Sequence, residues 1–414
     1  MRRRTSSGSH GVRALLGWAA GGSWFPRVFL AVAVLAVLIA TLTPMGGEKP
    51  RVTLCLVCGE RWASDVLLNL ILYAPVGIAL ALCGWRGPRA VIIPAILAAS
   101  IEVAQIWIPG RAPSLGDVTF NTLGAALGVM LVRSSSVWLR QEGRFKPALA
   151  VCAAATAVAA LAATGMLLRP DFPRSAYWGQ WTPDLGNMAR YRGLVLSARL
   201  GPRSLSQGRL DGSHQVRDLL LARAPLEVRA VAGPRVSALA PLVSIVDDRS
   251  REIVLLGPDR GDIVFRYRAR AASLGFDEPD MRAVGAMRAV GAGDSLSIAV
   301  RSDGRGYCLA LNERAMCGLG FTMGRGWALL YYAESFPPWL RMLLDDAWMA
   351  GLLIPLGFWV GGRGLAAGLI VAVAVAVWAV PPATGLLPAT SAEVAGAVLG
   401  FGLGRALQRF AAAP

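Results

Sequence analysis

Charged and metal-binding side chains are scarce in this chain of 414 residues. Charged residues make up 16% of it, whereas soluble globular proteins hold about a quarter. The two histidines, His10 and His214, have no partners at a spacing typical of a metal site. Lysine is almost missing as well, with only Lys49 and Lys146. We therefore expect no metal site and no bound cofactor.

The net charge of +16 comes from arginine and could suggest a nucleic-acid partner. The arginines, however, mostly flank apolar runs, and basic residues in that position set the orientation of membrane segments. We therefore expect no nucleic acid and take membrane lipids as the main surroundings of the chain.

Apolar residues make up 55% of the sequence and gather in long runs. A helix needs about 20 apolar residues to cross a bilayer. Eight runs approach this length: 28–42, 66–83, 90–108, 118–132, 148–168, 347–360, 365–380 and 394–407. The sequence thus predicts a polytopic α-helical membrane protein.

Basic connections indicate which side of the membrane each loop occupies. Residues 1–27 are basic, and no small-residue cleavage site follows the first run, so we expect a retained anchor with a cytoplasmic N-terminus. The segments 84–89, 133–146 and 361–364 then lie inside, as does the C-terminus, in agreement with the positive-inside rule. The polar stretch 169–340 falls outside the cytoplasm.

The two ends of the chain share a pattern. Asp117 leads to Gly124 and Gly128, and Glu393 leads to Gly400 and Gly404 at the same spacing. Such small-residue faces let helices approach closely. We therefore expect two parallel four-helix halves, the second of which has lost most of the polar residues of the first.

The outer segment changes from helical to strand periodicity. Short alternating or β-branched runs separated by Gly, Pro, Asp and Asn predict an antiparallel β-sandwich. The expected strands are 193–200, 226–231, 241–246, 252–256, 262–270, 295–301, 307–312, 315–321 and 327–334.

Four cysteines lie in polar segments predicted to be outside. A two-residue turn at Asn312-Glu313 would set Cys308 opposite Cys317, close enough for a disulfide. Cys55 and Cys58 could form a second small bridge or a redox pair; the absence of a thioredoxin-like βαβ pattern favours the bridge.

Polar residues also lie inside the predicted spans, where each is costly unless it finds a partner or water. They fall at a similar depth on three helices, beneath the outer turn that carries Arg111. The cluster consists of Asp65, Asn69, Glu102, Gln105, Arg111, Ser114, Asp117 and Asn121. It could lock the helices together, or it could form a pocket that is open to the outside and binds a head group.

These residues resemble the VanZ-like family as an ordered set of motifs over residues 28–133. The motifs are Asp65-x-x-x-Asn69, Pro75-Val-Gly77, Ser100-Ile-Glu102-Val-Ala-Gln105, Pro109-Gly-Arg111 with Ser114, and Asp117-x-x-x-Asn121-Thr-x-Gly124-x-x-x-Gly128. The resemblance implies a multi-pass protein of the bacterial inner membrane and a link to glycopeptide (teicoplanin) resistance. Any site that it implies belongs to the first half.

The outer segment is similar to concanavalin A-like (laminin G-like) sandwiches, through Ser297–Gly304 followed by Tyr307–Asn312. That resemblance implies glycan binding. The sequence shows no calcium-ligand set and no paired catalytic carboxylates, so hydrolase activity is not expected.

The sequence thus predicts five regions: a cytoplasmic N-terminus at 1–27, a VanZ-like membrane domain at 28–133, a loop and fifth helix at 134–168, a sandwich at 169–340 and the last helices at 341–414. The favoured function is binding of a lipid-linked glycan or cell-wall carbohydrate at the outer face. One alternative is an enzyme that modifies such a ligand, with Glu102 or Asp117 as general base; another is a transporter or flippase.

Overall fold

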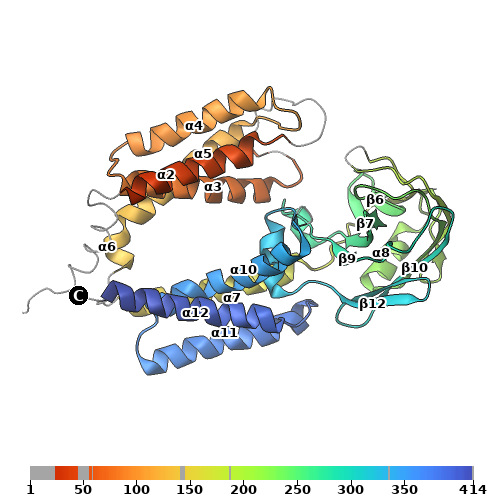
Figure 1. Cartoon of the computed structure of the whole chain (residues 1–414). Helices are drawn as coiled ribbons and strands as arrows, with labels where there is room; N and C mark the ends of the chain where they lie inside the picture. Colours follow the sequence, from red (N-terminus) through yellow and green to blue (C-terminus); the bar gives the residue numbers. More distant parts are fainter. Residues whose placement is uncertain are drawn as a thin grey trace, which may run out of the picture. The chain divides into compact units, whose positions relative to one another are not determined.

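The computed structural model describes residues 24–44, 56–57, 59–139, 145–185, 188–333 and 336–412. The chain forms two compact units, one made of Met1–Val158, Met349–Val373 and Val394–Pro414, the other of Ala159–Trp348 and Ala374–Glu393. Long helices make up the first unit, and a β-sandwich makes up most of the second (Figure 1).

Within the described residues, one long helix overlaps most of each of the eight predicted spans. These helices are α2 (Phe25–Leu42), α3 (Trp62–Leu82), α4 (Arg89–Gln105), α5 (Leu115–Arg133), α7 (Phe145–Leu167), α10 (Pro338–Trp359), α11 (Arg363–Thr384) and α12 (Ser391–Ala412), with the short α6 (Ser135–Trp138) after α5. All except α4 and α12 are long and apolar enough to cross a membrane. The protein is therefore a multi-pass membrane protein.

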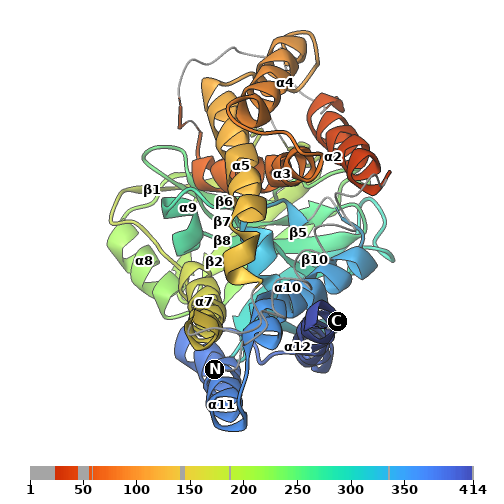
Figure 2. The ribbon, with the colours of Figure 1, turned by 90° about the vertical axis from the view of Figure 1, so that its left-hand side faces the viewer.

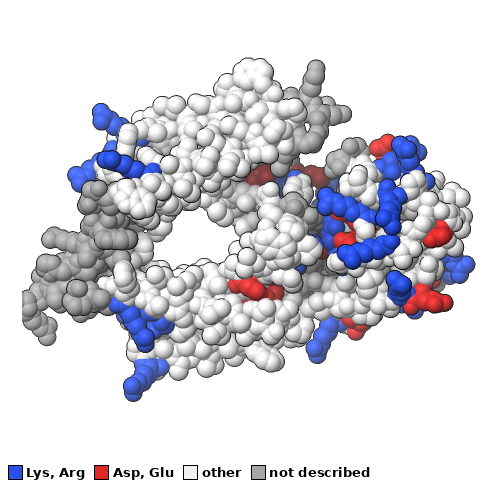
Figure 3. All heavy atoms as spheres, in the orientation of Figure 1, with Lys and Arg blue, Asp and Glu red and all other residues white. Residues whose placement is uncertain are grey.

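The helix surfaces fit this conclusion. Large apolar side chains such as Val32, Ile71 and Ile96 are exposed. Figure 3 shows the helices almost without charge along their sides, with basic side chains gathered at one end of them and over the sandwich. Exposed apolar side chains on so many helices are stable in lipid and not in water.

α2, α3, α4 and α5 pack into one bundle (Figure 1). Its core holds the buried side chains of Val37, Tyr73, Val76 and Ile101. Glycines set the distance between α3 and α5: a Cβ on Gly124 would lie 2.4 Å from the Leu70 carbonyl oxygen, and one on Gly128 2.1 Å from that of Ala74. Only glycine permits this close approach.

α10 and α12, which lie side by side in Figures 1 and 2, repeat this packing. A Cβ on Gly400 would lie 2.1 Å from the Ala350 carbonyl oxygen, and one on Gly404 2.2 Å from that of Ile354. The two contacts correspond in sequence position. Ala350 and Ile354 lie 280 positions after Leu70 and Ala74, and Gly400 and Gly404 lie 276 positions after Gly124 and Gly128. The α3–α5 contact thus recurs between α10 and α12.

The second unit contains two antiparallel six-stranded sheets. The first has the order β4 (Gly208–Arg209), β1 (Tyr177–Trp181), β6 (Val243–Asp247), β7 (Glu252–Asp259), β8 (Asp262–Tyr267), β9 (Met281–Ala283). The second has the order β12 (Arg314–Leu319), β11 (Tyr307–Leu311), β10 (Ser295–Ser302), β5 (Leu226–Val231), β2 (Leu194–Leu200), β3 (Arg203–Ser204). Buried Val228, Ile245, Ile263 and Leu309 belong to their core.

Some sequence expectations for this unit are wrong. The described residues of the predicted strand 327–334 form no strand, because the 3₁₀-helix η1 (Met323–Leu329) occupies the first part of this segment. β8 stops at Tyr267, and the short helix α9 (Arg270–Ser273) follows. β1 and the helix α8 (Ser213–Leu221) were not anticipated.

The hairpin β11–β12 turns at Asn312 and Glu313, since Leu311 pairs with Arg314. Asn312 has a positive φ of 51°, which asparagine tolerates better than most residues. A disulfide joins Cys308 to Cys317 across this hairpin. Cys55 and Cys58, the second predicted pair, lie outside the described residues.

Candidate functional site

Three helices of the first bundle bring the predicted polar residues together. Asn69 of α3 donates to the Asp117 carboxylate of α5 at 2.7 Å. Ser114 caps the start of α5, because its hydroxyl accepts from the Asp117 backbone N–H at 3.1 Å. The Asp117 side chain is therefore held by α3, and its backbone is held by the cap of its own helix.

Glu102 of α4 joins this network from the other side. Its carboxylate accepts from the backbone N–H of Ser114 at 2.8 Å, and only 7% of the residue is exposed. Tyr73, Arg111 and Asp117 lie near enough to interact with it electrostatically. A carboxylate enclosed at membrane depth is typical of a functional position.

Gln105 and Arg111 hold the end of α2. Gln105 donates to the Thr41 carbonyl at 2.9 Å. Arg111 donates to the carbonyls of Ala40 and Thr43 at 2.5 and 3.1 Å. The last carbonyls of a helix have no partner within the helix, so these two side chains supply one. This part of the cluster locks helices together.

Two further polar groups are buried in the bundle without a hydrogen-bond partner among the described residues. They are the Asn121 side-chain oxygen and the Tyr73 hydroxyl, on residues that are 1% and 0% exposed. A buried polar atom without a partner costs about 1–3 kcal/mol. Tyr73 was not anticipated, although a tyrosine one turn after Asn69 in an apolar helix was a signal that could have revealed it.

Asp65 lies at the exposed start of α3, where Arg61 and Asp117 are its electrostatic neighbours. By the same shifts of 280 and 276 positions, Asp65 corresponds to Asp345 on α10 and Asp117 to Glu393 on α12. These two carboxylates interact with each other as Asp65 and Asp117 do. The second half has therefore kept an acidic pair, although it has lost most of the other polar residues of the first.

In the second half η1 closes over this pair. Trp327 donates its indole N–H to Asp345 at 2.6 Å, and Arg325 lies 3.2 Å from the other Asp345 oxygen. The Thr322 hydroxyl donates to Glu393, which also accepts from the Thr390 backbone N–H at 2.9 Å. The pair is thus satisfied by the chain itself.

No group of three or more His, Cys, Asp and Glu residues that could hold a metal ion occurs in the described part of the chain.

Membrane-spanning helices, an enclosed carboxylate network and a two-sheet sandwich define the class: a polytopic membrane protein with an inserted β-domain. Residues 23–139, which include the bundle of α2 to α5, match the family model VanZ/LLP1, so this region is similar to that family. The match includes every residue of the polar cluster. No curated protein and no solved structure matches the chain.

Proposed function

We propose that the protein is a bacterial cell-envelope protein that binds a lipid-linked or glycan ligand at the outer face of the inner membrane. The observation that supports it best is the two buried groups without a hydrogen-bond partner among the described residues, Asn121 and Tyr73, of which Tyr73 interacts electrostatically with the Glu102 carboxylate. Gln105 and Arg111, by contrast, hold the end of α2. A ligand hydroxyl or amide would satisfy both groups and repay the cost of burying them.

Arg111 takes a narrower role in this proposal than the sequence suggests. Two of its nitrogen atoms already bind carbonyls of α2. It would therefore attract an anionic head group through its positive charge, without presenting a free two-pronged fork. Its second effect is to fix α2, so that substituting it changes the bundle as well as the ligand.

The proposed topology has eight spans in two parallel four-helix halves, with both termini in the cytoplasm and residues 169–340 outside. α4 has 17 residues and α12 carries Glu393, Arg405 and Arg409, so neither resembles a typical span by itself. The repeated glycine packing supports the inclusion of α12, because α12 is the counterpart of α5, a helix long and apolar enough to cross a membrane. The packing of α4 against α5 in the same bundle supports the inclusion of α4.

This function fits the similarity of residues 23–139 to the VanZ/LLP1 family. That similarity implies a role in the cell envelope and a link to glycopeptide resistance. The sandwich would extend the binding surface toward cell-wall carbohydrate.

Native mass spectrometry of the full-length protein in detergent tests the proposal. We compare the wild type with Glu102→Gln and Asn121→Ala. Thr119→Ala is the matched control, because its exposed hydroxyl bonds only to Leu115 of its own helix at 2.9 Å. The wild type and the control should carry a lipid-linked or glycan adduct that both cluster variants lose. The same bulk phospholipid on all four proteins would reduce the cluster to a helix lock.

A further inference from the structure

A cavity in the sandwich unit gathers basic side chains around the start of α8. Its volume is 630 Å³, within the range of small-molecule sites. It is lined by Arg174, Ser175, Ala176, Arg209, Leu210, Asp211, Gly212, Ser213, His214, Arg217 and Asp218. Only Ala176 and Leu210 are apolar, so the cavity suits a hydrophilic ligand.

The walls of the cavity are fixed by hydrogen bonds. The Ser213 hydroxyl accepts from the Tyr177 backbone N–H at 2.9 Å and donates to the Leu210 carbonyl at 2.8 Å, which ties α8 to β1 and to the end of β4. Arg217 donates to the Phe172 carbonyl at 2.7 Å and so ties α8 to the segment before β1. A preformed cavity loses little entropy when a ligand binds.

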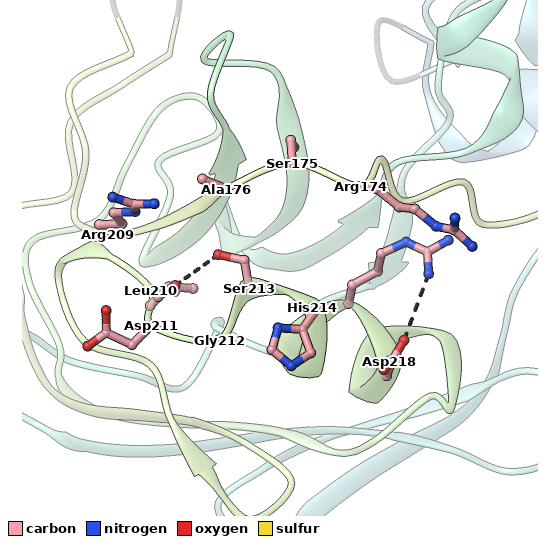
Figure 4. A pocket seen from close by; sticks show the side chains of 11 residues that line it. Arg174, Ser175, Ala176, Arg209, Leu210, Asp211, Gly212, Ser213, His214 and Asp218 are labelled. Atoms are coloured by element: carbon pink, nitrogen blue, oxygen red, sulfur yellow. Dashed lines mark hydrogen bonds and ion pairs between the residues drawn. The ribbon is translucent and has the colours of Figure 1, made fainter.

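Positive charge in the cavity exceeds negative charge. Arg174 and Arg209 are exposed, lie at opposite ends of the cavity in Figure 4 and have no side-chain partner among the described residues. Arg217 lies 3.8 Å from Asp218, which is a loose pair because the Asp218 side chain is 72% exposed. No side chain caps the N-terminus of α8, so its partial positive charge also faces this region.

The cavity also offers hydrogen-bonding groups besides the arginines. The Ser175 hydroxyl oxygen is buried and has no partner among the described residues. The carboxylates of Asp211 and Asp218 can accept hydrogen bonds from ligand hydroxyls, and arginine is well suited to binding phosphate. A bare phosphate would occupy only a small part of 630 Å³.

We propose that this cavity binds an anionic carbohydrate, a sugar that carries a phosphoryl group. The arginine at one end of the cavity would hold the phosphoryl oxygens, the other arginines would attract the anion through their charge, and Ser175 with the two aspartates would hold the sugar hydroxyls. The inference rests on the proposed glycan-binding role of the sandwich and is independent of the polar cluster in the helices, so the two sites can fail separately.

The test measures affinity of the full-length protein for a panel of hexose and hexosamine 1-phosphates by calorimetry, beside the neutral sugars and inorganic phosphate. We compare the wild type with Arg174→Ala and Arg209→Ala. Both side chains are exposed and have no side-chain partner in the described part of the chain, so these variants should fold normally. Arg229→Ala, an exposed arginine on β5 outside the cavity, is the matched control.

At least one sugar phosphate should bind about tenfold or more tightly than its neutral sugar and than phosphate, since the arginines contribute a charge-assisted hydrogen bond and further positive charge. Arg174→Ala and Arg209→Ala should each weaken it about tenfold, and Arg229→Ala should not. Equal binding by all variants, no preference over the neutral sugars, or equal binding of inorganic phosphate would overturn the proposal.

Extraction of the purified protein identifies the source of the natural ligand. A sugar phosphate in the organic phase indicates a lipid-linked head group, and one in the aqueous phase indicates a free sugar phosphate or a polymer fragment. Either result supports the assignment if Arg174→Ala reduces the amount recovered. Recovery that is the same for the variant and the wild type contradicts it.

Discussion

Single glycines decide how closely the membrane helices pack. Gly404 and Gly402 lie on the same helix, yet a Cβ on Gly404 would meet the Ile354 oxygen at 2.2 Å, whereas nothing lies within 4 Å of one on Gly402. Gly404→Ala should lower stability by about 1–3 kcal/mol through overpacking. Gly402→Ala should raise it by up to about 1 kcal/mol through helix propensity.

The measurement is the thermal unfolding midpoint of both variants in one detergent. A rise for both would show that α10 and α12 do not pack through Gly404.

Glu278 provides a test of burial in the sandwich unit. Burial raises the pKa of its carboxyl to about 7, although the Ala269 backbone N–H, which it accepts at 2.7 Å, acts against this. The charged form is thus disfavoured in the folded protein. The stability linked to neutral Glu278 is complete below its ordinary pKa of 4.5 and is lost as the pH rises through about 7.

Glu278→Gln keeps an acceptor for Ala269 and removes the charge. It should therefore stabilise the protein by about 3 kcal/mol at pH 8 and by far less at pH 5. The unfolding midpoint at the two pH values checks this. Glu227→Gln, at an exposed pair with Arg301, is the control and should change little at either pH. The same shift for both variants would contradict the burial of Glu278.

Sequence and structure agree on some residues of the site and differ on others. The spacing of Glu102 and Gln105 placed both on one helix face, and both are buried. The spacing could not reveal that Gln105 and Arg111 bind α2. Which side chains reach the free carbonyls at the end of a helix depends on the segment that packs beside that end, and this is not visible in the sequence. Asp345 was missed for a similar reason, since the partners that enclose it come from η1.

At the scale of elements, long apolar helices were predictable and the short elements of the sandwich were less so. Trp327–Glu334 is rich in aromatic and aliphatic residues, which favours a strand by propensity. The structure instead uses this region to bring Trp327 to Asp345. Packing against a buried carboxylate overrides the local preference. α8 was missed because its nine residues are mostly polar and short for a periodicity argument.

The contact between η1 and α10 should depend on Asp345. Asp345→Ala leaves the Trp327 N–H and the Arg325 guanidinium without their acceptor, which should cost about 3 kcal/mol. Hydrogen–deuterium exchange should rise in 323–329. Asp346→Ala, at the neighbouring and less buried position, is the control. Unchanged exchange in η1 of Asp345→Ala would show that the pair does not hold this segment.

At the scale of the whole molecule, the proposed topology places the Cys308–Cys317 disulfide outside the cytoplasm, where such bonds persist. In intact cells a membrane-impermeant maleimide should label both cysteines only after treatment with an impermeant reductant. A cysteine at the exposed Ser136, just after α5, should be labelled only once the cells are permeabilised. Labelling of Ser136→Cys in intact cells would invert the topology.

The proposed function and the proposed parallel halves together predict that the bundle of α2 to α5 binds a ligand, whereas η1 closes the corresponding carboxylate pair of α10 and α12. Asn69 of α3 corresponds to Met349 of α10 by the shift of 280 positions. A photoreactive diazirine side chain at each position would compare the two halves within one protein. Met349 is 2% exposed and Asn69 is partly buried, so each diazirine should react with neighbouring helices as well.

We predict that the diazirine at position 69 also captures a lipid-linked or glycan species, identified by the mass of the adduct, and that the one at position 349 does not. Identical adducts at both positions would contradict the claim that only the first half carries a ligand site.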